Sequence, residues 1–180
     1  DEFRMPSACG AVYDMEILGA GKLLACAGDD SIRGGKGADT VIGGGDNDRI
    51  FGDRGNDNVV GGTGDDFLQG NTGDDLVEGG TGNDSLRGGK DNDTLIGGEG
   101  NDSLYGDKGG DSLVGGAGAD KFYFNFAADG SFGVDTLTDF NRDQGDKILL
   151  SSNDFSVFEG KSSGENLTTD QFAVIPDFNP

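Results

Sequence analysis

Histidine and tryptophan are absent from this 180-residue chain, and only 3 prolines and 2 cysteines are present. Without histidine there is no Ser-His-Asp or Cys-His catalytic arrangement, and the commonest ligand of zinc and copper is missing. The two cysteines, Cys9 and Cys26, are too few for a disulfide scaffold, and the sequence leaves their redox state open. No apolar run approaches the roughly 20 residues of a membrane-spanning helix. These absences argue against an enzyme and against insertion into a membrane.

Positive charge is also scarce, because 13 basic residues stand against 34 acidic ones, for a net charge of −21. Such a surface repels nucleic acids and anionic membranes, so we expect neither as a partner. The acidic residues comprise 28 Asp and 6 Glu, and 36 residues are glycine. Leu, Ile, Val and Phe together number only 41, close to the level at which charged chains stay disordered. The composition therefore indicates either a disordered chain or one whose charge is neutralised by bound cations.

What the sequence does contain is a nine-residue repeat, which runs through ten units from Gly34 to Tyr123. Every unit has Gly at position one, Asp at position six and an apolar residue at position eight. A weaker unit, residues 25–33, precedes them and keeps Asp30 in phase. The position-six residues are Asp39, Asp48, Asp57, Asp66, Asp75, Asp84, Asp93, Asp102, Asp111 and Asp120. The position-one residues are Gly34, Gly43, Gly52, Gly61, Gly70, Gly79, Gly88, Gly97, Gly106 and Gly115.

Each unit predicts a turn followed by a short strand. Gly, Asp and Asn in the first six residues tolerate the positive φ of tight turns, and the last three residues form a strand whose middle side chain points inward. Two units close one coil of 18 residues, and stacked coils make two parallel sheets around a thin aliphatic core. We therefore predict an all-β parallel solenoid. Its inward side chains are Val41, Ile50, Val59, Leu68, Val77, Leu86, Leu95, Leu104, Leu113 and Phe122.

The same geometry brings acidic side chains together. Units n and n+2 lie on one edge of the solenoid, about one strand spacing (~4.8 Å) apart, so Asp39 is expected beside Asp57. Like charges at about 5 Å repel by on the order of 3 kcal/mol at an effective dielectric constant of 20. A divalent cation between each pair reverses the sign of this interaction. Carboxylates and turn carbonyls form an all-oxygen site, which suits Ca2+ better than Zn2+, Cu2+ or Mg2+.

The consensus GGxGxDxUx resembles the RTX (hemolysin-type) calcium-binding nonapeptide repeat, and the resemblance covers roughly residues 25–151. It implies a right-handed parallel β-roll in which position-six Asp and backbone carbonyls hold Ca2+ between successive turns on one edge. Carried onto this chain, it gives nine pairs, from Asp30/Asp48 to Asp102/Asp120, with the position-one glycines beside them. The first pair is weakened because Ala25 and Cys26 replace the paired glycines. We expect about seven to nine Ca2+ ions.

The segment after the repeats differs in kind, since 9 of the 12 Phe lie at or after Phe122. A solenoid needs its open end covered, so we divide the chain into the β-roll at 25–123 and an aromatic-rich β cap at 124–180. Residues 1–24 form a lead-in, either a degenerate coil or a non-native leader. Strand-like stretches of the last third are residues 122–126, 134–140 and 147–150, with further candidates at 153–158, 167–172 and 174–175.

Residues 139–145 imitate the start of a calcium-binding loop, but the Gly and the final Glu of such a loop are not in place. A plain turn is favoured there over an additional ion that involves Asp135 or Asp139. The acidic residues at position five, Asp29, Asp65 and Asp74, are expected to be solvated or bonded to backbone.

Two further positions point outward. Position three gives a basic row on one edge, which fits either a charge-balancing surface or the binding of an acidic polysaccharide. Position nine gives an apolar stripe, which fits ordinary β-propensity or contact with the cap, an upstream domain or another copy of the chain. The basic row is Lys36, Arg54, Thr72, Lys90 and Lys108. The stripe is Ile42, Val60, Glu78, Ile96 and Val114.

The function predicted from the sequence is calcium binding that drives folding of a module of a secreted or cell-surface bacterial protein. RTX proteins typically leave the cell by type I secretion with an uncleaved C-terminal signal, and no classical N-terminal signal peptide is evident here. One alternative is the non-catalytic C-terminal part of an extracellular protease, lipase or alginate epimerase. Another is an adhesin or surface-layer component that binds acidic polysaccharide. In each case the chain itself is not expected to be an enzyme.

Overall fold

The structure is a computed structural model that describes residues 2–4, 14–16, 19–25, 27–124 and 133–150. All regular elements in these ranges are β-strands, and none of the described residues belongs to a helix that could cross a membrane. Cys9, Cys26 and the strands expected after residue 151 lie outside the described residues.

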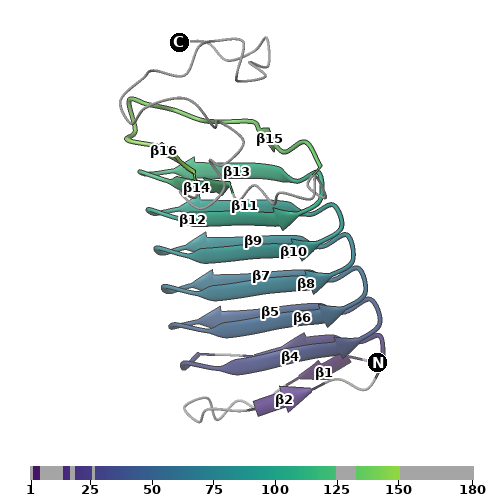
Figure 1. The fold of residues 1–180 in the computed structure, drawn as a ribbon. Coiled ribbons are helices and arrows are strands. Elements are labelled where there is room, and N and C mark those ends of the chain that lie inside the picture. Colours follow the sequence, from purple (N-terminus) through teal and green to yellow (C-terminus); the bar gives the residue numbers. More distant parts are fainter. Residues whose placement is uncertain (1, 5–13, 17–18, 26, 125–132, 151–180) are drawn as a thin grey trace.

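The described strands form two eight-stranded parallel sheets, stacked from β1 and β2 at one end to β15 and β16 at the other (Figure 1). Odd-numbered strands form sheet A: β1 (Glu2–Arg4), β3 (Lys22–Leu24), β5 (Thr40–Gly45), β7 (Asn58–Thr63), β9 (Leu76–Thr81), β11 (Thr94–Glu99), β13 (Ser112–Ala117) and β15 (Thr136–Leu137). Even-numbered strands form sheet B: β2 (Asp14–Glu16), β4 (Ser31–Lys36), β6 (Arg49–Arg54), β8 (Phe67–Thr72), β10 (Ser85–Lys90), β12 (Ser103–Lys108), β14 (Lys121–Phe124) and β16 (Lys147–Leu150).

The register confirms the predicted parallel solenoid with a coil of 18 residues. Val41 pairs with Val59, and Val59 pairs with Val77, so each step along sheet A advances by two repeat units. Sheet B has the same step, as in the pairing of Leu68 with Leu86. The chain therefore alternates between the two sheets every repeat, as the sequence pattern requires.

The strands of the repeats are longer than the three residues predicted, because they include the first three positions of the following unit. Along each strand, inward and outward residues alternate, and position one faces inward. Its glycines are buried, as the position-eight side chains are. Position two keeps a positive φ, which explains why Gly, Asp and Asn occupy it; φ is 125° at Gly62 and 79° at Asp53. Only positions four to six remain as the turn.

The hydrophobic core is a single column of side chains between the sheets. Leu23, Ile32 and all ten position-eight residues from Val41 to Phe122 have exposed fractions of 0–1 %. A buried Val, Leu or Ile contributes roughly 1.5–3 kcal/mol, and here each repeat supplies only one such residue. The core is therefore thin, and the turns must contribute to the stability of the fold.

Beyond Tyr123 the two sheets continue rather than stop. Leu137 of β15 pairs with Leu113, and Ile148 of β16 pairs with Phe122. Leu137 and Phe140 pack against the end of the core column, and the rings of Phe122 and Phe140 lie 6.2 Å apart. The described part of the last third thus adds strands to both sheets, while the domain boundaries proposed above remain predictions.

Candidate metal centres along the turns

The position-six aspartates lie directly before the strands and form two rows, one along each sheet. All of them are buried, with exposed fractions of 0–6 %. Row A precedes the strands of sheet A and consists of Asp39, Asp57, Asp75, Asp93 and Asp111. Row B precedes the strands of sheet B and consists of Asp30, Asp48, Asp66, Asp84, Asp102 and Asp120.

Within each row, one carboxylate oxygen is held by the neighbouring coil. The backbone N–H of Asp39 donates to Oδ1 of Asp57 at 2.8 Å, and the N–H of Asp57 donates to Oδ1 of Asp75 at 2.8 Å. The same bond, 2.7–2.9 Å long, joins all nine pairs from Asp30/Asp48 to Asp102/Asp120. The structure therefore places side by side the pairs that the nine-residue spacing predicts.

The second carboxylate oxygen, Oδ2, has no hydrogen-bond partner. In the described part of the chain, eleven buried side-chain oxygen or nitrogen atoms are unpartnered, and ten of them are row Oδ2 atoms; the other is Oδ1 of Asn58. A buried charged acceptor without a partner costs more than the roughly 1–3 kcal/mol of a neutral one. Ten repetitions of the same deficit on one residue type indicate a ligand for these oxygens. The ten atoms belong to Asp39, Asp48, Asp57, Asp66, Asp75, Asp84, Asp93, Asp102, Asp111 and Asp120.

The electrostatics of the rows also indicate a bound cation. Burial raises the pKa of every row carboxyl, to about 8 for Asp93, about 7 for Asp75 and about 6 for Asp102. Carboxylates of the adjacent coils add to the increase, as Asp57 does for the pKa of Asp75. Ionised carboxylates are thus unfavourable in these positions unless a cation lies close to them.

The position-one glycines leave room beside the unpartnered oxygens. A Cβ on Gly52 would lie 2.5 Å from Oδ2 of Asp57 and 3.0 Å from the carbonyl oxygen of Gly70 in the next coil. A Cβ on Gly34 would lie 3.1 Å from Oδ2 of Asp39 and 2.6 Å from the carbonyl oxygen of Gly52. A carboxylate oxygen and a backbone carbonyl of the next coil therefore approach the same point, which a side chain would occupy.

These donors fit Ca2+. Among the described residues, no three Asp, Glu, Cys or His side chains meet at one point, so a cation would need backbone oxygens as well as carboxylates. Carboxylate and carbonyl oxygens are hard ligands, and their number around a cation can vary. Ca2+ prefers such ligands, whereas Zn2+ and Cu2+ do not. The role of the individual Asp and Gly residues as ligands remains a prediction.

Position five carries a second ladder of hydrogen bonds between coils. In this ladder the later residue donates its N–H to the earlier side chain, the reverse of the position-six ladder. The N–H of Asp65 donates to Oδ1 of Asn47 at 2.8 Å, and the N–H of Asn83 donates to Oδ1 of Asp65 at 2.7 Å. Asp29 and Asp74 accept backbone N–H groups in the same way, which agrees with the predicted backbone bonding. The asparagines of this ladder were not predicted, although the enrichment of Asn at position five was a signal. The ladder asparagines are Asn47, Asn56, Asn83, Asn92 and Asn101.

Three acidic residues after the repeats also contact the last coils. Asp135 accepts the N–H of Asp111, and Asp146 accepts the N–H of Asp120, each at 3.0 Å. Asp139 accepts the N–H groups of Gly115 and Gly116 through its two oxygens. Asp135 and Asp139 were candidates from the sequence, but Asp146 was not, because the repeat frame is interrupted before it.

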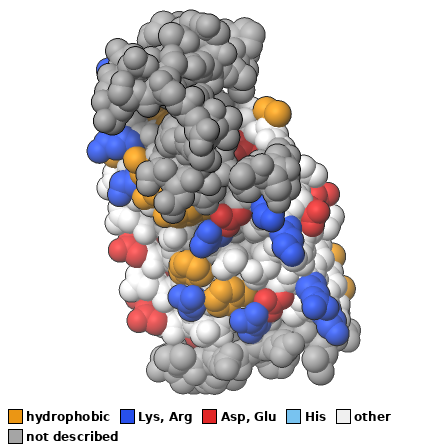
Figure 2. Space-filling view, viewed as in Figure 1, with side chains coloured by type: hydrophobic (Ala, Val, Ile, Leu, Met, Phe, Trp, Pro, Cys, Tyr) orange, Lys and Arg blue, Asp and Glu red, His pale blue; other side chains and the backbone are white. Residues whose placement is uncertain are grey.

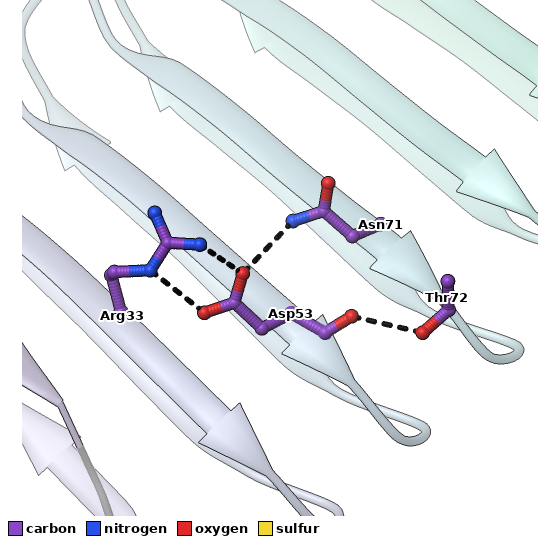
Figure 3. A network of polar contacts seen from close by, with 4 residues as sticks. All are labelled: Arg33, Asp53, Asn71 and Thr72. Atoms are coloured by element: carbon purple, nitrogen blue, oxygen red, sulfur yellow. Dashed lines mark hydrogen bonds and ion pairs between the residues drawn. The ribbon is translucent and has the colours of Figure 1, made fainter.

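The outer face of sheet B carries cross-strand polar pairs close to the turns. The Arg33 guanidinium pairs with both oxygens of Asp53, and Asn71 and Thr72 donate to Oδ1 and to the backbone carbonyl of Asp53 (Figure 3). Arg87 and Asp107 form a second bidentate pair. Figure 2 shows basic, acidic and hydrophobic side chains intermixed over the described coils.

The fold and the two rows of buried aspartates define a class of protein, the parallel β-solenoid with acidic turns that fit Ca2+. A family model, the RTX calcium-binding nonapeptide repeat, matches residues 27–59, 51–86, 60–95, 87–122 and 96–130. These segments overlap and together span residues 27–130, more than half of the 180-residue chain. The chain belongs to the RTX calcium-binding nonapeptide repeat family, whose repeats bind Ca2+ in a β-roll. Among curated proteins, none matches the chain.

Proposed function

We propose that this chain is a calcium-dependent folding module of a secreted protein. The observation that carries the proposal is the set of ten buried row Oδ2 atoms without a hydrogen-bond partner. A thin core of one apolar side chain per repeat has little stability to offset these buried charges. Neutralising them makes the folded state favourable, so binding of the cation and folding become one equilibrium.

The residues proposed to hold the ion are the row aspartates and the backbone around the position-one glycines. When bound, Ca2+ supplies two positive charges and accepts several oxygen ligands at once. In the folded state the chain orients these ligands, because backbone N–H groups hold Oδ1 of each Asp and leave Oδ2 directed toward the glycine backbone. The missing Cβ at position one keeps that space open.

We propose secretion because the same charge balance makes folding depend on the calcium concentration. Where Ca2+ is submicromolar, as in the cytosol, the rows repel and the chain stays unfolded, a state suited to passage through a narrow exporter. Outside the cell, sites with dissociation constants of about 10⁻⁴ to 10⁻³ M fill and the chain folds. The support is that RTX repeat proteins are typically secreted by type I secretion. The parent protein would then be extracellular or attached to the cell surface.

The module is proposed to be structural rather than catalytic. Its 180 residues contain no histidine, and its acidic groups are arranged by the repeat instead of around one cleft. If an upstream protease, lipase or epimerase domain belongs to the same protein, this chain would stabilise and export that domain.

The decisive experiment is a calcium titration followed by circular dichroism, with Mg2+ at the same ionic strength as a comparison. We expect strand content to appear cooperatively with Ca2+ and not with Mg2+. Asp93→Asn should raise the calcium midpoint several-fold, because it removes a buried row carboxylate. Asp91→Asn, two residues away and exposed, removes the same charge and should leave the midpoint unchanged. A chain equally folded in chelator and in calcium would refute the proposal.

A second candidate function is the binding of an acidic polysaccharide along the basic row. Lys36 pairs in register with Arg54, and Lys90 with Lys108, so like charges lie on adjacent strands of sheet B. Lys90 and Lys108 also line a pocket of about 480 Å³. Its polar neighbours are Gln69, Asn71, Thr72 and Asp107. Adjacent cations beside hydrogen-bonding groups suit a polymer that carries one carboxylate per sugar.

This candidate is tested by affinity electrophoresis in polyuronate gels. The double variant Lys90→Glu/Lys108→Glu should lose retardation, and Lys121→Glu, an exposed lysine outside the basic row, should keep it. Equal retardation of all three proteins would exclude the basic row as the binding surface.

A further inference from the structure

The row geometry continues into two aspartates that lie beyond the family match. Asp135 and Asp146 accept the N–H groups of Asp111 and Asp120, as each row Asp does for its predecessor. The next residue also follows the repeat, because the N–H of Thr136 donates to the carbonyl of Asp111 at 2.7 Å and that of Lys147 to the carbonyl of Asp120 at 2.8 Å. In the repeats the equivalent bond joins Leu76 N–H to the Asp57 carbonyl at 2.9 Å.

The sequence around these residues contains two units that are out of frame. Residues 130–138 read GSFGVDTLT and residues 141–149 read NRDQGDKIL, with Asp at position six and Leu or Ile at position eight. The distances from Asp111 to Asp135 and from Asp120 to Asp146 are 24 and 26 residues instead of 18. Insertions of six residues before the first unit and two residues before the second therefore hide two further units from a search at a fixed period.

The unpartnered oxygens identify which coil completes each site. Oδ2 of Asp57 approaches the same point as the carbonyl of Gly70, which belongs to the following coil on its edge. The same approach occurs at Gly34, Gly43, Gly61, Gly79 and Gly97, where a Cβ would lie beside both Oδ2 of the Asp of its unit and a glycine carbonyl of the following coil. We extend this forward direction to the other row Oδ2 atoms, because their side chains occupy the same position of the repeat. Asp111 and Asp120 have unpartnered Oδ2 atoms too, and their exposed fractions are 2 % and 0 %. The coil that follows Asp111 on its edge contains Asp135, and the coil that follows Asp120 contains Asp146.

We propose that Asp135 and Asp146 complete the last two calcium sites of the solenoid, one with Asp111 and one with Asp120. This inference rests on the proposed calcium-dependent folding. It means that the segment after the repeats docks onto the solenoid through shared ions as well as through Leu137 and Phe140. The number of sites becomes ten, one for each unpartnered row Oδ2.

The structure also gives a reason for the calcium sites of row B to begin after Asp30 and to end at Asp146. Oδ2 of Asp146 accepts the N–H of Asn141 at 2.8 Å, so row B needs no ion beyond Asp146. Each carboxylate oxygen of Asp146 accepts one backbone N–H and keeps a second lone pair for the ion shared with Asp120. At the start, Ala25 occupies position one of the Asp30 unit, where the later units have glycine. Asp30, the most exposed of the row aspartates at 6 %, is not among the residues with a fully buried unpartnered oxygen. The Asp30/Asp48 pair therefore holds no ion in this scheme.

The test counts bound calcium in the full chain. Wild type, Asp135→Asn, Asp146→Asn and the double variant are dialysed against the Ca2+ concentration that just saturates the wild type, and bound Ca2+ is measured by atomic emission. Each single variant should bind one ion fewer and the double variant two fewer. Asp143→Asn, an exposed residue of the same segment, removes an equal charge and should bind as many ions as the wild type.

A second readout locates the effect. Hydrogen exchange at the Thr136 and Lys147 amides should become faster in the variants, while far-UV circular dichroism and exchange in β5 to β12 stay at wild-type values. An unchanged ion count in both variants would overturn the inference. Loss of all ions together with the sheet would also overturn it, because the two carboxylates would then support the whole fold. A wild type that binds no calcium would instead refute the proposed function itself.

Discussion

At the scale of the residue, position six needs a carboxylate with two separate tasks. Oδ1 accepts a backbone N–H of the preceding coil, and Oδ2 is directed toward the glycine backbone. Asparagine can perform the first task but not the second, because its amide nitrogen is a donor and carries no charge. Position five has only the first task, and there Asn and Asp both occur. This difference explains why Asp is invariant at position six but not at position five.

The space at position one yields a prediction at this scale. Gly52→Ala places a Cβ 2.5 Å from Oδ2 of Asp57, so the carboxylate must move away from its ligand position. We expect weaker calcium binding and a loss of about 1–3 kcal/mol in the free energy of unfolding at saturating calcium. Calorimetric calcium titration and thermal unfolding measure both quantities.

The control is Gly45→Ala, whose Cβ would meet only the hydroxyl of Thr63 at 3.2 Å. It changes the same residue type at an outer position of a strand and should have little effect. Equal effects of the two substitutions would mean that the glycine backbone, and not the space beside the carboxylate, matters.

At the scale of the element, the outer faces of the strands contribute through cross-strand pairs. In sheet B, Arg87 pairs with Asp107 at 2.9–3.0 Å and lies 5.1 Å from the centre of the Tyr105 ring. The Tyr105 ring stacks on that of Tyr123 with centroids 4.1 Å apart. These contacts link β10, β12 and β14, so they support the last coils at the point where the core column ends.

Arg87→Ala tests this support. A partly exposed ion pair contributes roughly 0.2–1 kcal/mol, and a cation–π contact about 0.5–1 kcal/mol. We expect the variant to lose about 1 kcal/mol of unfolding free energy at saturating calcium, measured by chemical denaturation. Arg54→Ala, at an exposed strand end, should lose much less. If both variants were equally stable, the outer-face pairs would have no measurable role.

At the scale of the whole molecule, the buried rows make the fold respond to pH when calcium is removed. Burial raises the pKa of the row carboxyls above the ordinary 3.8, to about 6 for Asp111 and about 8 for Asp93. The folded state therefore binds more protons than the unfolded chain, and stability rises as pH falls. In chelator we expect strand content to increase as the pH is lowered from about 8 through about 6.

Circular dichroism in chelator at a series of pH values checks this sign, with sedimentation to exclude aggregation. Strand content that is constant or decreases on acidification would contradict it. In that case, the buried charges of the row carboxylates would not explain why the calcium-free chain fails to fold.

Much of the architecture could be predicted from the sequence because it is periodic. One apolar residue in nine and one aspartate in nine determine the two sheets, the core column and the pairing of Asp39 with Asp57. The sequence could not reveal that strands extend through the paired glycines, since a glycine pair reads as a turn until its backbone pairs with a neighbour. It also could not place Asp146, because the insertion before it removes the period.

By itself, then, the sequence determined the fold class, the coil length and the acidic rows, because each depends on local spacing repeated many times. Only the tertiary structure decided which carboxylate oxygen is bonded and which is unpartnered, since that depends on the backbone of the adjacent coil. It also decided that Asp135 and Asp146 lie at the ends of the rows. Those contacts join residues 24 and 26 apart instead of 18, and a spacing outside the repeat does not specify which residues meet.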